Sequence, residues 1–244
     1  MKNLKFINSN ALKILAMAFM LLDHMWGTIV PGNEWMTCVG RIAFPIFAFM
    51  ISEGYVHTSD FKKYAKRLFF FGLISEIPFD LMATGSFFFV FHQNVMFTLL
   101  LGLLSIREID KFKQDLSLKQ GALCLLKVAL YLLIGIFGFV DYGAMGILVI
   151  IAFYIFRDVK FGRIFQLASL ILMFIVLFEG YQMVIPIAGR EFLFPRQGFG
   201  VLAMIPICLY NGKKGANGKL LKHAFYWFYP VHMAAIYLIW KFII

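Results

Sequence analysis

Long apolar segments separated by short polar connections recur along the whole chain. Apolar runs of about 15–20 residues suit helices that cross a lipid bilayer, and none of the polar connections is long enough to form a soluble domain. The pattern predicts an all-α, polytopic transmembrane helix bundle of about nine spans. The expected spans are residues 12–30, 35–56, 67–82, 87–106, 121–140, 142–157, 164–178, 197–210 and 224–241.

The basic residues gather in alternate connections between these spans. They are Lys2, Lys5 and Lys13; Lys62, Lys63, Lys66 and Arg67; Arg107, Lys111, Lys113 and Lys119; Arg157, Lys160 and Arg163; and Lys213, Lys214, Lys219 and Lys222. The connections at 31–34, at 83–86 and near 141 contain no lysine or arginine. Because cytoplasmic loops of membrane proteins carry the excess of basic residues, we expect the N-terminus to lie in the cytoplasm.

Composition agrees with this interpretation and excludes others. Of the 244 residues, 61% are hydrophobic and 15% are charged, whereas soluble proteins are about half apolar and a quarter charged. We therefore expect one transmembrane domain, residues 1–244. The net charge of +10 is explained by the basic loops, so the expected partner is membrane lipid and not nucleic acid.

Two further features have simple interpretations. The N-terminal residues "MKNLKFINSNALKILAMAFM" look like a signal peptide, but no small-x-small cleavage site follows, so we expect a retained first span. Cys38, Cys124 and Cys208 lie far apart without the spacing of metal ligands, and we expect no metal.

The segment 179–196, "EGYQMVIPIAGREFLFPR", interrupts the alternation of charge. It contains Arg190 and Arg196 although the topology places it outside, and its apolar centre is too short to cross a bilayer. It is either a re-entrant or interfacial segment that lines a cavity, or an outer basic loop that touches lipid headgroups.

Most polar residues within the spans fall near the outer leaflet. These residues are Asp23, His24, Arg41, Glu76, Asp80, His92, Asn94, Asp141, Glu179 and His232, while Glu53, His57 and Asp60 lie at the cytoplasmic end. A charge in hydrocarbon costs roughly 2.5–3.5 kcal/mol, so these side chains should point inward. We expect them to line a polar chamber that is open to the outside.

Helix geometry limits which of these side chains can meet. Glu76 and Asp80 are four residues apart and share a helix face, where they either line the chamber or pair with Arg41. His92 lies near an interface, where a headgroup or loop contact explains it better than a place in the chamber.

Asp23 cannot orient His24, because neighbouring helix residues point about 100° apart. A carboxylate that orients His24 must come from Glu76, Asp80, Asp141 or Glu179, and Asp23 is then expected to bond to Arg41.

The chain resembles the TraX family over nearly its whole length. The resemblance is carried by "LKILAMAFMLLDHMW", "GRIAFPIFAFMISEGY", "RLFFFGLISEIPFDL", "NVMFTLLLG", "DYGAMGIL" and "FYWFYPVHMAAIYL". The named member of this family acetylates the N-terminal amine of bacterial conjugative pilin. The family is also distantly similar to integral-membrane acyltransferases that use cytoplasmic acetyl-CoA, which implies a multi-pass protein of the bacterial plasma membrane.

The resemblance implies an acetyltransferase with acetyl-CoA as its co-substrate. Lys13 and His24 match the spacing of a basic residue and a histidine in the first span of those acyltransferases. Lys13 and Asn94 would then contact the coenzyme A thioester, and His24 would act as general base or form a transient acyl-histidine. The acceptor would be an amine or hydroxyl at the outer face.

The remaining polar residues would assist the transfer. Arg41, Asn94 or His232 would stabilise the oxyanion, and Glu76 with Asp80 would help to deprotonate an amine acceptor. The site residues are completed by Asp23, as the partner of Arg41.

Two other functions fit the same residues. Carboxylates and histidines within a membrane also form the proton relays of transporters. A structural or assembly subunit could use the polar cluster for hydrogen bonds that hold its helices together.

Overall fold

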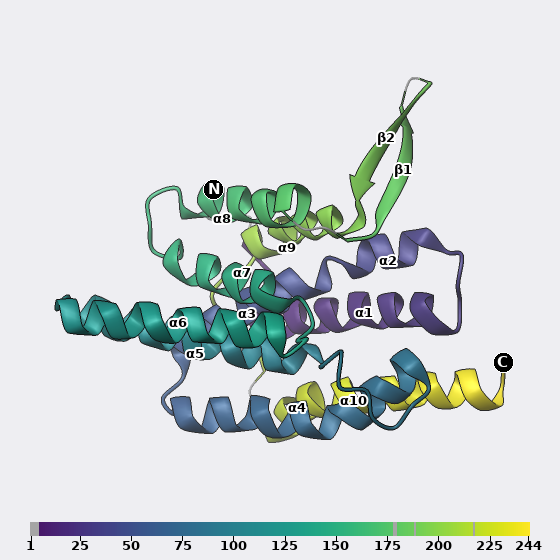
Figure 1. Cartoon of the computed structure of the whole chain (residues 1–244), viewed down its shortest axis with the longest axis horizontal. Coiled ribbons are helices and arrows are strands. Elements are labelled where there is room, and N and C mark those ends of the chain that lie inside the picture. Colours follow the sequence, from purple (N-terminus) through teal and green to yellow (C-terminus); the bar gives the residue numbers. More distant parts are fainter. Residues whose placement is uncertain (1–4, 178–179, 188, 217) are drawn as a thin grey trace. The chain divides into compact units, whose positions relative to one another are not determined.

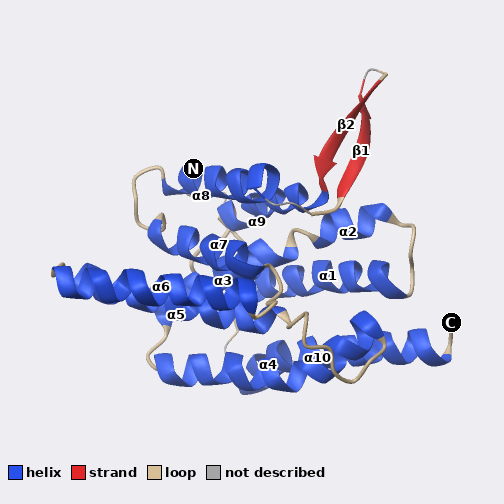
Figure 2. Ribbon diagram, in the orientation of Figure 1, coloured by secondary structure: helices blue, strands red, loops and turns tan. Residues whose placement is uncertain are grey.

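A computed structural model describes residues 5–177, 180–187, 189–216 and 218–244. The chain is mostly helical, as expected (Figure 1). The helices are α1 (Ser9–Thr28), α2 (Glu34–Gly40), α3 (Ala43–His57), α4 (Phe61–Thr84), α5 (Val95–Gln114), α6 (Leu118–Phe137), α7 (Gly143–Ile155), α8 (Gly162–Ile171), a π-helix η2 (Leu172–Leu177), a 3-10 helix η3 (Arg196–Ala203), α9 (Met204–Cys208) and α10 (Lys219–Phe242). Strands β1 (Gln182–Ile187) and β2 (Arg190–Pro195) form the only sheet among the described residues (Figure 2).

The chain divides into two compact units. The first contains Met1–Phe47, Phe156–Phe225 and Leu238–Ile244, and the second contains Ala48–Ile155 and Tyr226–Tyr237. In the first unit α1 packs against α2, and η3 contacts α2, η2 and α8. In the second unit α5 packs against α4, α6 and α7.

The core of the second unit shows why α5 and α7 lie so close together. A Cβ atom on Gly102 would lie 2.3 Å from Cδ1 of Ile150, so only glycine permits this approach. Leu103, Ile106 and Ile150 are fully buried around it. Phe49 of α3 meets Phe153 of α7 edge to face, with 5.6 Å between the ring centroids.

Two helical segments of the described chain are long and apolar enough to cross a bilayer by themselves. They are Glu34–His57, formed by α2 and α3, and Leu118–Phe137. The first is broken at Arg41 and Ile42 because Pro45 has no N–H to donate to the carbonyl of Arg41. The expectation of a helical protein is confirmed, whereas nine spans are not.

Several expected spans differ from the observed helices. Residues 87–94 of the expected span 87–106 are not helical, because the Asn94 side chain caps α5 by accepting a hydrogen bond from the N–H of Met96. The expected span 142–157 is the 13-residue α7, about 20 Å long, which is shorter than a bilayer core. The expected span 197–210 is divided between η3 and α9.

The segment 179–196 forms an antiparallel hairpin from Gln182 to Pro195, apart from Ala188, which lies outside the described residues, as does Glu179. The side chains of Val184 and Phe192 are about half exposed, and that of Leu193 is 70% exposed. A two-stranded sheet has open edges, and open edges do not occur within lipid hydrocarbon. The edges of the hairpin are therefore expected beside water or protein, which fits both a cavity-lining segment and an outer loop.

Candidate functional site

Gly40 and Asp23 determine how α2 meets α1 in the first unit. A Cβ atom on Gly40 would lie 2.4 Å from Cβ of Asp23 and 2.8 Å from its Cγ. A side chain at residue 40 would therefore collide with the aspartate. The glycine allows the end of α2 to lie directly on the last turns of α1.

This close approach places Arg41 against Asp23. The Nη2 atom of Arg41 contacts both carboxylate oxygens of Asp23, and the side chains are 25% and 16% exposed. The expected pair is therefore confirmed. Gly200 of η3 covers the same position, since a Cβ there would lie 3.2 Å from the carbonyl oxygen of Arg41.

His24 follows Asp23 on the next face of α1. Its side chain is half-buried, and its carbonyl oxygen accepts a hydrogen bond of 2.7 Å from the Thr28 hydroxyl. Lys13, further toward the start of α1, has its Nζ atom 5.3 Å from the centroid of the Phe225 ring. The roles expected for His24 and Lys13 stay predictions.

A second arginine completes the charged group of the first unit. Arg196, at the start of η3, forms an ion pair of 2.6 Å with Glu34 and lies over the Trp26 ring, 4.8 Å from its centroid. The sequence placed Arg196 either in a re-entrant or interfacial segment or in an outer basic loop, and named no partner for it. Its position beside an apolar segment, against the alternation of charge, was the signal that it has a fixed partner.

In the second unit, Glu76 and Asn94 join α4 to the start of α5. Glu76 Oε1 accepts hydrogen bonds from the backbone N–H of Asn94, at 3.0 Å, and from its side-chain amide. The same amide donates to the carbonyl of Gly72 at 2.9 Å, and Asn94 is fully buried. These contacts give Asn94 a structural role, and the expected contact with coenzyme A stays a prediction.

Asp80 lies one helical turn beyond Glu76 and is 2% exposed. Its Oδ2 accepts a hydrogen bond of 2.8 Å from the N–H of Phe89. Its Oδ1 is buried and has no hydrogen-bond partner among the described residues. Glu76 and Asp80 thus both bond to the connection between α4 and α5, while Arg41 contacts Asp23.

The same connection carries His92, which meets Asp141. His92 Nε2 lies 3.7 Å from Oδ1 of Asp141, an ion-pair distance, and the two side chains are 46% and 32% exposed. The Asp141 carboxylate, helped by Glu76 and Asp80, raises the pKa of His92 above its usual 6.5 although partial burial acts the other way. His92 lies in a connection outside the helices.

Backbone contacts hold the two residues together. The N–H of Gln93 donates to the carbonyl of Phe139 at 2.8 Å, and the N–H of Asp141 donates to the carbonyl of Gln93 at 2.9 Å. Phe139 and Tyr142, on either side of Asp141, have φ angles of 52° and 61°. Such left-handed residues cost of order 1 kcal/mol each, and the surrounding bonds maintain them.

Helix α10 borders this cluster. The hydroxyl of Tyr229 lies close to the backbone N–H of Val95 and near the carboxylates of Asp141 and Glu76. The Tyr229 ring centroid is 5.8 Å from that of His232.

His232 is buried and stacks on Phe228 with 4.6 Å between ring centroids, and its Nδ1 lies 2.7 Å from the Phe228 carbonyl oxygen. This contact anchors the His232 ring to its own helix. Its expected function stays a prediction.

The expected site residues therefore form two groups. Lys13, Asp23, His24 and Arg41 belong to the first unit, whereas Glu76, Asp80, Asn94 and His232 belong to the second. A single chamber that contains both groups stays a prediction.

The sequence analysis placed His92 and Asp141 near the outer leaflet but did not include them among the catalytic residues. Each stands alone in a short connection, and neither signals its partner. Together they form a partly exposed histidine beside a carboxylate, an arrangement that can accept and return a proton.

A mostly helical chain, two of whose described helical segments are long and apolar enough to cross a bilayer, fits the class of α-helical membrane-associated proteins. More particularly, the chain belongs to the TraX family, whose model, described as TraX protein, matches residues 8–240. This confirms the resemblance carried by the sequence motifs.

A curated relative extends the comparison. The probable fimbrial assembly protein FimC, serogroup H1, of Dichelobacter nodosus is 30% identical over 253 aligned residues, which cover 92% of each chain. No solved structure matches the chain.

Proposed function

We propose that this protein is an integral-membrane acyltransferase that moves an acetyl group from cytoplasmic acetyl-CoA to an amine or hydroxyl at the outer face. The observation that carries the proposal is the His92–Asp141 pair, with Nε2 and Oδ1 3.7 Å apart and His92 46% exposed. Glu76 and Asp80 add two carboxylates beside it. A histidine that a carboxylate orients can serve as a general base that remains accessible to an acceptor.

The pair supports a specific proton path. With Nε2–H directed toward Asp141, the neutral ring has its acceptor lone pair on Nδ1. As the acceptor nitrogen or oxygen bonds to the thioester carbon, Nδ1 takes its proton and Asp141 stabilises the imidazolium. The C–S bond then breaks, and the leaving thiolate of coenzyme A receives the proton.

His24 is the base that the family resemblance favours, and it stands beside the Asp23–Arg41 pair. In the proposed reaction the Arg41 guanidinium stabilises negative charge on the carbonyl oxygen. Lys13, near the start of α1, would contact the anionic part of coenzyme A. His24 and His92 are thus rival bases, one in each unit, and substitution can separate them.

The proposed topology is multi-pass, with the N-terminus in the cytoplasm. The basic residues in the first turns of α4, on both sides of the turn between α5 and α6, and in the connection after α7 support it, because positive charge favours the cytoplasmic side. Reporter fusions after Lys63 and Lys119 should report the cytoplasm, and a fusion after Ser86 should report the outside. A cytoplasmic signal at Ser86 would overturn this topology.

The name of the fimbrial assembly relative supports an acceptor that belongs to a surface fibre. We propose the N-terminal amine of a fibre subunit as this acceptor. An amine must lose a proton to react, and the Glu76–Asp80 face lies beside His92 to receive it.

The decisive experiment incubates the purified protein in detergent with labelled acetyl-CoA and a peptide with a free N-terminal amine. Released coenzyme A thiol and labelled peptide are both measured. Wild-type protein should transfer the label, and His92→Ala or His24→Ala should lower the rate 100-fold or more. His57→Ala, whose side chain is 60% exposed, is the matched control and should leave the rate unchanged.

Each outcome decides between proposals. If only His92→Ala abolishes transfer, His92 is the base. If only His24→Ala abolishes it, the base is His24, as the family resemblance favours. If neither substitution changes the rate, or if the wild-type protein transfers no label, the acyltransferase proposal is wrong.

The relative's name also favours a non-catalytic membrane subunit that assembles fimbriae. In that case cells that carry His24→Ala or His92→Ala would still assemble surface fibres, although purified protein transfers no acetyl group. A proton-coupled transporter, in contrast, would acidify or alkalinise proteoliposomes in a manner that depends on His92.

A further inference from the structure

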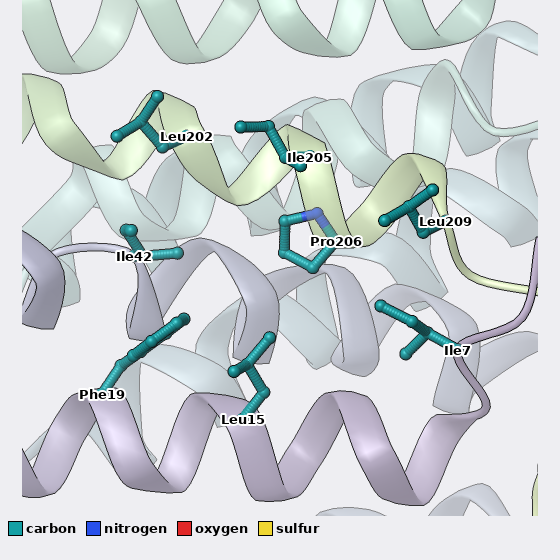
Figure 3. Close-up of a pocket in the computed structure, with 8 residues that line it drawn as sticks. All are labelled: Ile7, Leu15, Phe19, Ile42, Leu202, Ile205, Pro206 and Leu209. Carbon is teal, nitrogen blue, oxygen red and sulfur yellow. The ribbon is translucent and has the colours of Figure 1, made fainter.

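An apolar groove runs along α1 in the first unit. Figure 3 shows that Leu15 and Phe19 face Leu202, Ile205, Pro206 and Leu209 across it, with Ile42 beside Phe19 at one end and Ile7 at the other. All eight lining residues are apolar, and the groove has a volume of about 350 Å³. Ile205 is 61% exposed and Leu202 is 45% exposed, so the groove is open along one side.

The end of the groove near Ile7 is tied together by backbone hydrogen bonds. The N–H of Ile7 donates to the carbonyl of Leu209 at 3.0 Å, and the N–H of Asn211 donates to the carbonyl of Ile7 at 2.9 Å. The N–H of Ser9 donates to the carbonyl of Lys213 at 2.8 Å. The chain before α1 and the chain after α9 therefore form a fixed pair of segments at this end.

This pair of segments brings basic residues to one end of the groove. Lys5 stands two residues before Ile7, and Lys213 stands four residues after Leu209, and both are exposed. In contrast, the lining itself contains no polar side chain. The groove thus has a hydrocarbon-like length and a positively charged end, which is the distribution of chemistry in an anionic phospholipid.

The length of the groove also fits. From Asn8 to Phe19, α1 rises by about 17 Å, at about 1.5 Å per residue. A bilayer core is about 30 Å thick, so one leaflet is about 15 Å. The basic end would then lie at the headgroup level of one leaflet and Phe19 near the bilayer centre.

We propose that this groove holds one acyl chain of an anionic membrane phospholipid, whose phosphate lies near Lys5 and Lys213. The proposal rests on the membrane location given under the proposed function. The pantetheine arm of coenzyme A is a poorer occupant, because its amides would lie against a lining that offers no hydrogen-bond partner.

Native mass spectrometry of the detergent-purified protein tests this proposal, with phosphatidylglycerol and phosphatidylcholine of the same chain length added in turn. The wild-type protein should retain phosphatidylglycerol about tenfold more than phosphatidylcholine. Ile205→Trp fills the groove and should lower this retention at least tenfold. Ile164→Trp is the matched control, because Ile164 of α8 is 62% exposed and does not line the groove.

A charge variant tests the basic end. The double substitution Lys5→Gln and Lys213→Gln should reduce the preference for phosphatidylglycerol to about twofold or less. Lys119→Gln with Lys160→Gln is the control of equal charge and should retain the preference. Equal retention of both lipids by the wild-type protein, or unchanged retention by Ile205→Trp, would overturn the proposal.

The readout separates this proposal from the acyltransferase. His24→Ala and His92→Ala should retain the lipid at the wild-type level even if they lose acetyl transfer. If Ile205→Trp loses the lipid but transfers acetyl groups at the wild-type rate, the result supports the lipid groove and says nothing against or for the acyltransferase proposal.

Discussion

The guanidinium of Arg41 contacts both carboxylate oxygens of Asp23, although Asp23 lies in α1 and Arg41 follows the last residue of α2. Gly40 makes this possible, because any side chain at that position would occupy the space of Asp23. The ion pair and the close packing of α1 against α2 therefore depend on each other.

Removal of one charge of the pair should destabilise the protein more than removal of both charges. Arg41→Gln or Asp23→Asn alone should lower the free energy of unfolding by about 1–3 kcal/mol, less than for a fully buried pair because the side chains are 25% and 16% exposed. The double variant should lose less than the sum. Denaturation of the four proteins in detergent measures the difference, and strict additivity would exclude a direct interaction.

Gly40→Ala should destabilise the protein by about 1–3 kcal/mol, because the new Cβ atom overlaps Asp23. Gly27→Ala is the matched control within α1. No atom lies within 4 Å of a Cβ at residue 27, so this substitution should be neutral or stabilise the helix by up to about 1 kcal/mol. Thermal unfolding compares the two, and equal effects would contradict the packing of α2 on α1.

The His92–Asp141 pair should depend on pH. Because the carboxylate raises the pKa of His92, the pair contributes stability fully below about pH 6.5, the usual histidine value, and loses it as pH rises through the raised value. Asp141→Asn should lower the His92 pKa, which histidine NMR titration in micelles would detect. An unchanged titration midpoint would show that Asp141 does not act on His92. Asp115→Asn, in the exposed connection after α5, serves as the control.

Asn94→Ala should lower the free energy of unfolding by more than the loss of an ordinary helix cap does. Ser117 caps α6 through a hydrogen bond of 3.3 Å at an exposed position, so Ser117→Ala should cost about 1 kcal/mol. Asn94 also bonds to Glu76 and Gly72 while fully buried, and its loss should cost about 2–4 kcal/mol. Chemical denaturation of both variants gives the difference, and similar losses would mean that the bonds to α4 contribute little.

Glu108 lies near the expected cytoplasmic end of α5, beyond the expected span 87–106. Its carboxylate forms ion pairs with Lys111 at 2.6 Å and with Lys127 at 3.0 Å. Burial alone would raise its pKa, but the two lysines lower it below the usual 4.5. The stability that the group contributes is present above about pH 4.5 and is lost as pH falls through the lowered value. Glu108→Gln should therefore reduce the acid sensitivity of unfolding in this range. Unaltered acid unfolding would contradict this role.

The sequence by itself determined the helical class, the family and one contact of the candidate site. Helical periodicity is local, so it placed Glu76 and Asp80 on one face of α4. The argument that neighbours on a helix cannot face each other also led to the Asp23–Arg41 pair. The helix break before Ala43 also has a local cause, since Pro45 lacks the N–H that a continuous helix needs, but the expected span 35–56 contained no break.

Only the tertiary structure decided which polar groups meet across the connections. His92 and Asp141 are brought together by backbone hydrogen bonds between two turns, and Asn94 is held by Glu76 from α4. The hairpin at Gln182–Pro195 likewise depends on cross-strand pairing. Such contacts arise from the packing of distant segments, and a pattern that repeats every few residues carries no information about them.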